Sequence, residues 1–207
     1  MSSPSDGFQV SLIKYLPGFD LSLSSDQIEL CTRHYELMLK WNKSINLSRI
    51  TDPDEAARFH YCESMFADRF LPADAKIADL GSGAGFPGIP LSILKSERPL
   101  RLIESNSKKA IFLKEAVRSL NLQNTKVDSE RFERLNLKDF IWTTRASERL
   151  ASNLKSLFAS TDPQGLILFL GADLKEKVIV FQELGWNIEF AQIPLSEGRL
   201  IVSARRA

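Results

Sequence analysis

The sequence predicts an α/β protein, with a mostly parallel seven-stranded sheet, one antiparallel strand and a helical N-terminal extension. Three observations predict this fold. Strand-like and helix-like segments alternate from about Ala75 onward, whereas only helical periodicity precedes Phe70. A glycine-rich turn follows the first strand-like segment. The last two strand-like segments are close enough to form a hairpin, which would place one antiparallel strand in the sheet.

Length and charge agree with this division. The chain has 207 residues, of which 43% are hydrophobic and 26% are charged, and a net charge of +1. Residues 1–70 carry 7 basic and 10 acidic side chains, and residues 71–207 carry 20 and 16. We therefore expect a helical extension over residues 1–70 and a main domain over residues 71–207. The near-neutral total argues against a protein that binds nucleic acid by charge alone, but it allows a local RNA site.

Cysteine and histidine usage excludes several classes of protein. The two cysteines, Cys31 and Cys62, are too few for a disulfide framework. Neither they nor the two histidines, His34 and His60, have zinc-ligand spacing, so we expect no metal site. We see no signal-peptide pattern and no apolar run that approaches the roughly 18 residues of a membrane span. We expect a cytoplasmic protein with no membrane association and no stable protein partner.

Two helices are expected in the extension. The first runs from about Ser25 to Lys43, and Ser24 with Gln27 can form a capping box. The second begins near Pro53, with Asp52 as its cap. Two such helices cannot bury their apolar stripes on each other alone, so we expect them to pack on the main domain. The stripes contain Ile28, Cys31, Tyr35, Met38 and Leu39 in the first helix, and Phe59, Cys62, Phe66 and Phe70 in the second.

The main domain alternates strands with helices, which predicts a parallel sheet covered on both faces. In such sheets, ligands bind at the carboxyl ends of the strands. The expected helices are Ile89–Lys95, Ser107–Leu120, one around Leu154–Phe158, and Leu174–Leu184. The expected strands are Lys76–Leu80, Leu100–Glu104, Thr125–Asp128, Phe140–Thr144, Leu166–Leu170, Trp186–Ile193 and Arg199–Ala204.

Residues 79–88, Asp-Leu-Gly-Ser-Gly-Ala-Gly-Phe-Pro-Gly, allow two nucleotide-type interpretations. Gly83 to Gly88 matches the G-x-G-x-x-G spacing of dinucleotide sites. However, the first glycine comes about two residues late after the strand, and Asp79 would face a pyrophosphate. A tight turn without a ligand is a third interpretation, although so many glycines weaken a turn that needs no close approach.

An S-adenosylmethionine site accounts better for these residues. Asp79 can lie near the methionine ammonium, and bare amides at Gly81 and Gly83 can face the methionine portion. Glu104 ends the next strand, 25 residues after Asp79, where an acidic residue can accept both ribose hydroxyls. This pair of acidic residues around the turn favours S-adenosylmethionine over a dinucleotide.

Other candidates are weaker. Phe132 and Glu133 follow the third strand and can flank an adenine, or they can simply begin a helix. Arg145 ends the fourth strand, where it can face a ligand or be a solvated surface residue. His60 fits a partly buried helix residue with satisfied hydrogen bonds better than a base or a ligand. Trp41 is expected in the core.

Taken together, several blocks resemble the ribosomal RNA small-subunit methyltransferase G family, formerly glucose-inhibited division protein B. They lie between about Tyr35 and Gly171, in the family's order. They are Trp41-Asn42-Lys43 with Asn46-Leu47-Ser48; Thr51-Asp52-Pro53; His60 with Glu63-Ser64; residues 79–91; Glu104-Ser105 with Lys108-Lys109 and Phe112-Leu113; and Thr144-Arg145-Ala146.

The resemblance implies a Rossmann-like class I fold and methyl transfer from S-adenosylmethionine to N7 of a guanine in the 530 loop of bacterial 16S rRNA. It assigns cofactor binding to Gly81, Phe86, Phe132, Glu133 and Arg145, and ribose binding to Glu104. There are two departures. Glu63 stands where the family usually has Asp, and Leu170 stands where it often has Lys, a role for which Lys175 is a candidate.

The implied chemistry needs no general base, because guanine N7 already has an in-plane lone pair. We therefore assign Arg145 a positioning role. The expected partner is 16S rRNA or the small ribosomal subunit. Lys108, Lys109 and Arg149 are the RNA-binding candidates, with Arg205 and Arg206 as further possibilities. Two alternatives remain: a class I methyltransferase with another substrate, and an assembly factor that binds S-adenosylmethionine without turnover.

Overall fold

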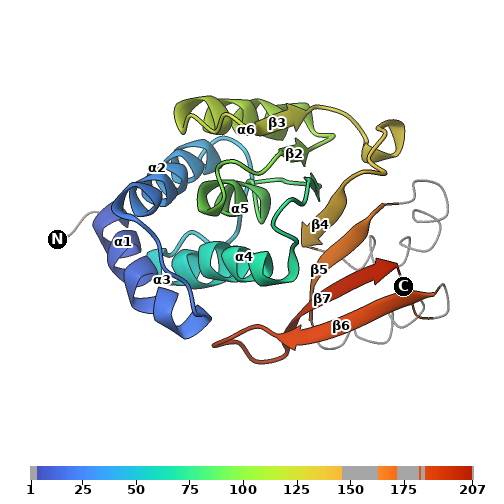
Figure 1. The fold of residues 1–207 in the computed structure, drawn as a ribbon. Coiled ribbons are helices and arrows are strands. Elements are labelled where there is room, and N and C mark those ends of the chain that lie inside the picture. Colours follow the sequence, from blue (N-terminus) through green and yellow to red (C-terminus); the bar gives the residue numbers. More distant parts are fainter. Residues whose placement is uncertain (1–3, 146–162, 172–181, 183–184, 207) are drawn as a thin grey trace.

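Seven strands form one mixed sheet in the computed structural model, which describes residues 4–145, 163–171, 182 and 185–206. The strands are β1 Ile77–Leu80, β2 Leu100–Ile103, β3 Thr125–Asp128, β4 Ile141–Arg145, β5 Gly165–Gly171, β6 Trp186–Gln192 and β7 Arg199–Arg206. Their order is β3-β2-β1-β4-β5-β7-β6 (Figure 1). Strands β1 to β5 pair in parallel, and β7 is antiparallel to both of its neighbours. The predicted sheet, hairpin and single antiparallel strand are confirmed.

The strand order creates a switch point between β1 and β4. From β1 the chain adds β2 and then β3 on one side, and then returns to place β4 on the other side. Open α/β sheets bind ligands beside the carboxyl ends of the strands at such a point. The turn after β1 and the end of β4 therefore lie at the expected ligand edge.

Apart from α1, the described α-helices begin and end close to the predicted bounds. They are α1 Pro4–Tyr15, α2 Ser25–Asn42, α3 Pro53–Glu55, α4 Glu63–Phe66, α5 Gly88–Leu94 and α6 Ser107–Ser119. The capping box is present, since the Gln27 amide donates to Ser24 Oγ and the Ser24 amide donates to Gln27 Oε1. Asp52 Oδ1 accepts from the amides of Asp54 and Glu55 and so caps α3. The helices expected around 154–158 and 174–184 lie outside the described residues, apart from Gln182.

Helix α1 was not predicted. Its Phe8 and Leu12 are fully buried, but Val10 and Ile13 are 66% and 50% exposed. These exposed apolar residues blur the periodicity from which an amphipathic helix is recognised. Tertiary packing nevertheless orders the segment, because the Phe8 ring stacks on Tyr35 of α2 with ring centroids 4.5 Å apart.

The second predicted helix is a continuous helical segment with a change of winding. After α3, residues Ala56–Cys62 form a π-helix, in which the Glu63 amide donates to the Arg58 carbonyl five residues back. The stripe predicted with α-helical spacing is therefore partly wrong. Cys62, Phe66 and Phe70 are buried, but Phe59 is only half-buried. The wider turn rotates Phe59 away from the core.

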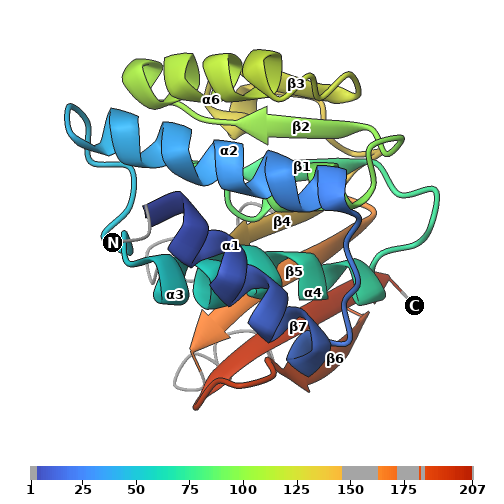
Figure 2. The same cartoon turned by 90° about the vertical axis from the view of Figure 1, so that its left-hand side faces the viewer.

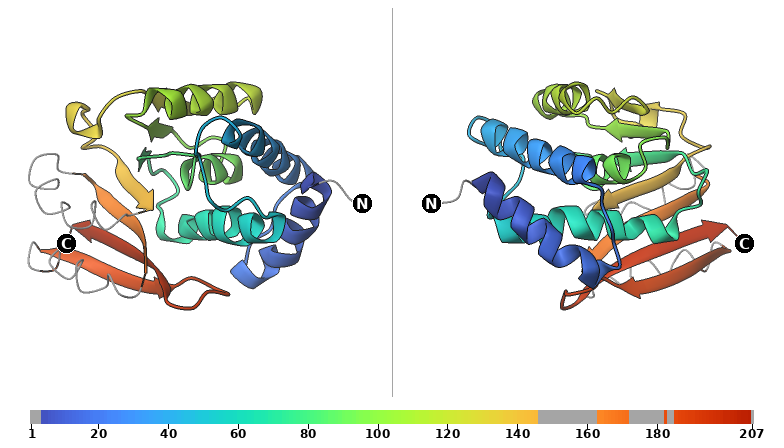
Figure 3. Two further views of the ribbon diagram at one scale, coloured as in Figure 1. Left: turned by 180° about the vertical axis from the view of Figure 1, so that it is seen from behind. Right: turned by 60° about the vertical axis from the view of Figure 1, so that its left-hand side comes forward.

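The helical extension shares its core with one face of the sheet. One buried cluster runs from Phe8 in α1 to Ile201 in β7. Helix α2 packs on α5 and α6, where the half-buried Trp41 ring meets Phe112 edge-on at 5.9 Å. Figure 2 shows α1, α2 and α4 in front of the sheet, and both views of Figure 3 show the blue to teal helices together on one side of the orange and red strands. Within the described ranges, no helix is long and apolar enough to cross a membrane.

Candidate active site

The turn between β1 and α5 has free space beside its first glycine, Gly81. Gly81, Gly83 and Gly85 have φ values of 70°, 55° and 91°, a region that L side chains rarely adopt. A Cβ at Gly81 would meet nothing within 4 Å, whereas a Cβ at Gly85 would lie 2.4 Å from Ile89 Cδ1. The third glycine is thus required by packing, and the first leaves room for a ligand.

The expectation of free amides at Gly81 and Gly83 is wrong. The Gly81 amide donates to the Ile103 carbonyl at 2.9 Å, which extends the β1–β2 ladder past the end of β1. The Gly83 amide donates to Glu104 Oε2 at 3.0 Å. Consequently the turn offers a ligand the space over Gly81 rather than these two N–H groups.

Glu104 is held at the end of β2. The residue is 8% exposed, and its carboxylate accepts from two backbone amides, that of Gly83 at Oε2 and that of Asn106 at Oε1, the latter at 2.8 Å. Each carboxylate oxygen has a second lone pair, so both can still accept a hydroxyl. The carboxylate therefore has a defined orientation beside the turn, as a ribose-binding acid requires.

Asp79 lies beneath the turn and is fully buried. Its Oδ2 accepts from the Gly88 amide at 3.1 Å, at the start of α5. Its Oδ1 is buried and has no hydrogen-bond partner among the described residues. Burial raises the pKa of Asp79 to about 7, against the opposing effect of the Gly88 hydrogen bond. The proximity of Asp79 to a ligand ammonium stays a prediction.

Phe86 joins the turn to the helical extension. It is 6% exposed and stacks on the His60 ring at 4.3 Å. His60 is a buried helix residue, as predicted, and its Nε2 is 2.7 Å from Ser48 Oγ. The expectation of a fully satisfied ring is wrong, because its buried Nδ1 has no partner within the described chain. Burial, together with the nearby Arg145 charge, lowers the pKa of His60 to about 2. The ring is therefore neutral at physiological pH.

Phe132 and Glu133 form a short 3₁₀ turn, Phe132–Arg134, after β3. Phe132 is half-buried, and its ring meets the Trp142 ring edge-on at 6.3 Å. Glu133 is exposed. The structure thus places both residues beyond the carboxyl end of β3, where an adenine edge was expected.

Arg145, the last residue of β4, is bound to the helical extension. Its Nη2 donates to the Phe59 carbonyl at 2.7 Å and to Ser64 Oγ at 3.0 Å. Its Nη1 lies 3.6 Å from Glu63 Oε2, and its guanidinium lies 5.0 Å from the Phe169 ring centre. Burial lowers the pKa of Arg145 to about 10, so the side chain remains charged at neutral pH. Arg145 is a fixed part of the ligand edge, and not a solvated surface residue.

Glu63 and Arg199 form an ion pair that sequence reasoning missed. Arg199 Nη2 lies 2.9 Å from Glu63 Oε2, and the Glu63 side chain is fully buried. Burial raises the pKa of Glu63, while Arg145 and Arg199 oppose that shift. One signal was available, since Glu63 lies within the apolar stripe of the second helix, between Cys62 and Phe66, and a buried carboxylate there needs a partner.

The candidate RNA ligands do not form one group. Lys108 is exposed and Lys109 is half-buried in the first turn of α6, next to Glu104 along the chain. Arg149 lies outside the described residues. Arg205 and Arg206 end β7, at the edge opposite the candidate site, where Arg205 donates to the Phe70 carbonyl and Arg206 lies over the Trp186 ring.

These features fit S-adenosylmethionine. The open space at Gly81 admits a ligand next to the backbone, and the oriented Glu104 carboxylate retains capacity for ribose hydroxyls. The buried Asp79 oxygen without a partner suits a cationic group. Within the described part of the chain, no group of three or more acidic, cysteine or histidine side chains is arranged to hold a metal ion.

Sequence comparisons give a consistent family. The family model described as rRNA small subunit methyltransferase G matches residues 27–192. Ribosomal RNA small subunit methyltransferase G of Halorhodospira halophila is 32% identical over 197 residues, covering 93% of this chain and 94% of the relative. Ribosomal RNA small subunit methyltransferase G 1 of Syntrophobacter fumaroxidans is 39% identical over 142 residues. That match covers 69% of this chain but only 63% of the relative.

Solved structures share the fold at low sequence identity. Ribosomal protein L11 methylase from Lactobacillus delbrueckii subsp. bulgaricus has a TM-score of 0.57 at 12% identity, over 70% of this chain and 78% of the other. Precorrin-6y C5,15-methyltransferase from Geobacter metallireducens has a TM-score of 0.54 at 15% identity, over 79% and 92%. The predicted Rossmann-like methyltransferase fold is confirmed. By its sequence the chain belongs to the rRNA small subunit methyltransferase G family.

Proposed function

We propose that this protein transfers a methyl group from S-adenosylmethionine to N7 of a guanine in the 530 loop of bacterial 16S rRNA, within the small ribosomal subunit. As a member of its family, the chain is an S-adenosylmethionine-dependent methyltransferase of ribosomal RNA. Its place of action is the cytoplasm, where ribosomal subunits are found.

One arrangement carries the proposal. Glu104 Oε2 accepts the Gly83 amide and so holds a carboxylate next to the open space at Gly81, at the switch point of the sheet. In the bound state Glu104 accepts the ribose hydroxyls, and Asp79 lies near the cationic end of the cofactor. The remaining cofactor contacts come from Phe86, Phe132, Glu133 and Arg145.

The chemistry matches a site without a general base. When bound, S-adenosylmethionine supplies an electrophilic methyl group on a sulfonium. Guanine N7 has a lone pair in the ring plane, so no proton has to leave before attack. Both histidines are buried, and burial lowers the pKa of His34 to about 3 and that of His60 to about 2. Neither ring is placed to exchange protons with a substrate, which agrees with catalysis by positioning.

Arg145 is the positioning residue. Three hydrogen bonds and the contact with Glu63 hold its guanidinium between the helical extension and the end of β4. The side chain can form a rigid wall between the cofactor and the target base. Because its pKa stays near 10, it retains its charge and does not act as an acid or base at neutral pH.

A labelling experiment tests the function. Small ribosomal subunits that lack the methyl group are incubated with the protein and methyl-labelled S-adenosylmethionine, and the rRNA is digested to nucleosides. We expect labelled 7-methylguanosine that maps to the 530 loop. Subunits that already carry the methyl group serve as the control and should accept no label.

Two other outcomes would contradict the proposal. Label in a different nucleoside, in protein or in a small molecule would indicate a class I methyltransferase with another substrate. Cofactor binding without any label, at several magnesium concentrations and with naked rRNA, precursor particles and complete subunits, would indicate an assembly factor that does not turn over.

A further inference from the structure

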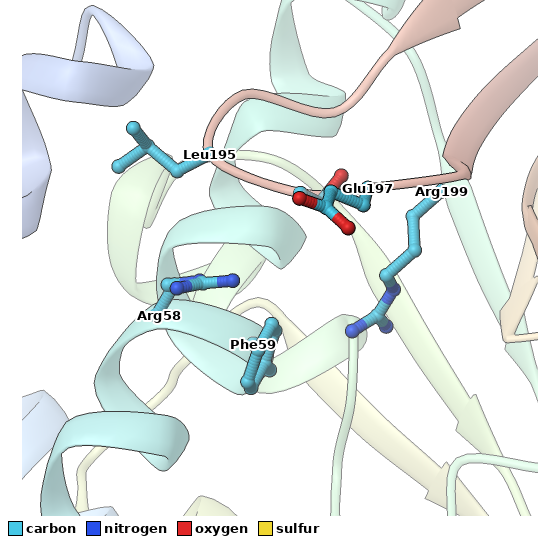
Figure 4. Close-up of a pocket in the computed structure, with 6 residues that line it drawn as sticks. Arg58, Phe59, Leu195, Glu197 and Arg199 are labelled. Carbon is cyan, nitrogen blue, oxygen red and sulfur yellow. The ribbon is translucent and has the colours of Figure 1, made fainter.

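A cavity of about 690 Å³ lies between the π-helical segment and the loop that joins β6 to β7. Figure 4 shows Arg58 and Arg199 on either side of Phe59, with Leu195 and Glu197 of the loop above them. The Arg58 guanidinium lies 4.3 Å from the Phe59 ring centre, and that of Arg199 lies 5.2 Å from it. The half-buried aromatic ring thus orients two cationic groups that line the same cavity.

Arg58 has capacity for a ligand. Across the described ranges, no carboxylate comes within 4.0 Å of its guanidinium, and its Nε is buried without a hydrogen-bond partner. Most buried polar atoms in proteins are satisfied, so a buried guanidinium nitrogen without a partner calls for an acceptor. The π-helical winding places Arg58 here, because it turns residues 58 and 59 out of the core stripe.

The cavity adjoins the end of β4, because Arg199 is common to its lining and to that of a smaller neighbouring cavity. The smaller cavity, of about 230 Å³, is also lined by Arg145 and Phe169. The carboxylate that contacts both Arg145 and Arg199 is Glu63, and it is fully buried beneath them. An anion in the larger cavity would therefore face the guanidinium groups and not the Glu63 carboxylate.

We propose that this cavity binds a backbone phosphate of the RNA strand next to the target nucleotide, with Arg58 as its main ligand. The inference rests on the proposed function, because it assumes an RNA substrate at the adjacent site. A guanidinium fork matches the oxygens of a phosphate and pairs with two of them. Glu197, which is exposed on the opposite wall, opposes an anion and weakens this binding.

The test uses small ribosomal subunits as the probe and measures KM, kcat and the salt dependence of KM. We expect Arg58→Gln to raise KM for subunits roughly tenfold with kcat unchanged, since a phosphate contact is equal in the ground and transition states. The slope of log affinity against log salt should fall by about 0.7, the value for one phosphate of a single strand. Glu197→Gln should act in the opposite direction and lower KM.

The matched control is Arg69→Gln. Arg69 lies over the Phe66 ring at 4.9 Å in the same helical extension, but it is not among the residues that line the cavity. This variant should leave KM and the salt slope unchanged. Arg58→Lys retains the charge, so it should keep most of the salt slope while its affinity for subunits decreases. Calorimetric titration with S-adenosylmethionine verifies that every variant is folded.

The outcomes separate the two proposals. If the unmodified protein does not methylate subunits, the proposed function fails. If it does, and Arg58→Gln behaves like Arg69→Gln in KM and salt slope, the phosphate site is overturned while the function stands. A salt slope that falls in Arg58→Gln and persists in Arg58→Lys supports the phosphate site.

Discussion

The His60 ring stacks on the Phe86 ring, with 4.3 Å between ring centroids and 13° between the ring planes. His60 belongs to the π-helical segment, and Phe86 belongs to the glycine-rich turn. The stack therefore connects the helical extension directly to the turn that would hold the cofactor. Tyr61 meets the same Phe86 ring edge-on at 5.2 Å, so the turn rests on an aromatic surface formed by the extension.

This stack predicts that the extension stabilises the cofactor turn. His60→Ala removes the ring and should weaken S-adenosylmethionine binding about tenfold, because a turn without this support must be ordered when the cofactor binds. It should also lower the free energy of unfolding by about 2 to 3 kcal/mol. Calorimetric titration and urea denaturation measure the two effects.

The matched variant is His60→Phe, which keeps an aromatic ring and removes only the hydrogen bond with Ser48 Oγ. It should retain most of the cofactor affinity. Equal affinity in His60→Ala and the unmodified protein would show that the stack does not support the turn.

The two buried histidines predict a loss of stability in mild acid. Burial lowers their folded pKa values to about 3 for His34 and about 2 for His60, while unfolded histidine titrates near 6.5. As pH falls below about 6.5, the unfolded chain takes up protons that the folded chain does not. Each histidine should thus reduce the free energy of unfolding by about 2 kcal/mol at pH 5.

Nuclear magnetic resonance can check this residue by residue, because the chain has only two histidines. In the folded protein, neither imidazole signal should shift between pH 8 and pH 5, whereas both should titrate in urea. A folded-state titration above pH 5 would contradict the assignment. Asp79 has the opposite effect on stability between about pH 4 and pH 7, because its pKa is raised to about 7 and the folded chain there binds a proton that the unfolded chain does not. The resonance signals of the two histidines are therefore more informative than the total free energy of unfolding.

Substitution of Gly81 should have two effects, one on the backbone conformation and one on cofactor binding. Gly81→Ala places a side chain at φ +70° and should lower the free energy of unfolding by about 1 to 2 kcal/mol. The added methyl group would also enter the open space over the turn and should abolish measurable cofactor binding.

Gly185 provides the control for Gly81. It has φ +78°, and a Cβ there would also meet nothing within 4 Å, but it precedes β6 at the opposite edge of the sheet. Gly185→Ala should cost similar stability and leave cofactor affinity intact. If both variants retain the cofactor, the space at Gly81 is not the binding site.

Lys108 and Lys109 predict a charge-dependent contribution to RNA binding. They lie in the first turn of α6, four and five residues after Glu104. If these side chains bind phosphates of single-stranded RNA, replacing both with Gln should reduce the slope of log affinity against log salt by about 0.7 per phosphate. Filter binding with a 530-loop RNA fragment measures that slope.

Lys76 and Lys95 form the matched pair, because they precede β1 and follow α5 at the other edge of the sheet. Their double substitution by Gln should not change the slope. An identical slope in both double variants would remove Lys108 and Lys109 from the RNA-binding surface.

Local patterns in the sequence determined much of this protein. The capping box at Ser24, the cap at Asp52, the strand segments and the glycine turn all follow from propensity and periodicity within a few residues. The position of Glu104 at the end of the second strand also follows, because a parallel sheet brings successive strand ends to one edge.

Only the tertiary structure decided how Arg145 and Arg199 meet Glu63, and how Phe86 meets His60. These contacts join segments of chain that are 26 to 136 residues apart, and their geometry depends on helix packing and on the π-helical winding. Sequence periodicity describes the faces of single elements. It contains no information on which buried charge faces which, because that choice follows from the free energy of the whole packed core.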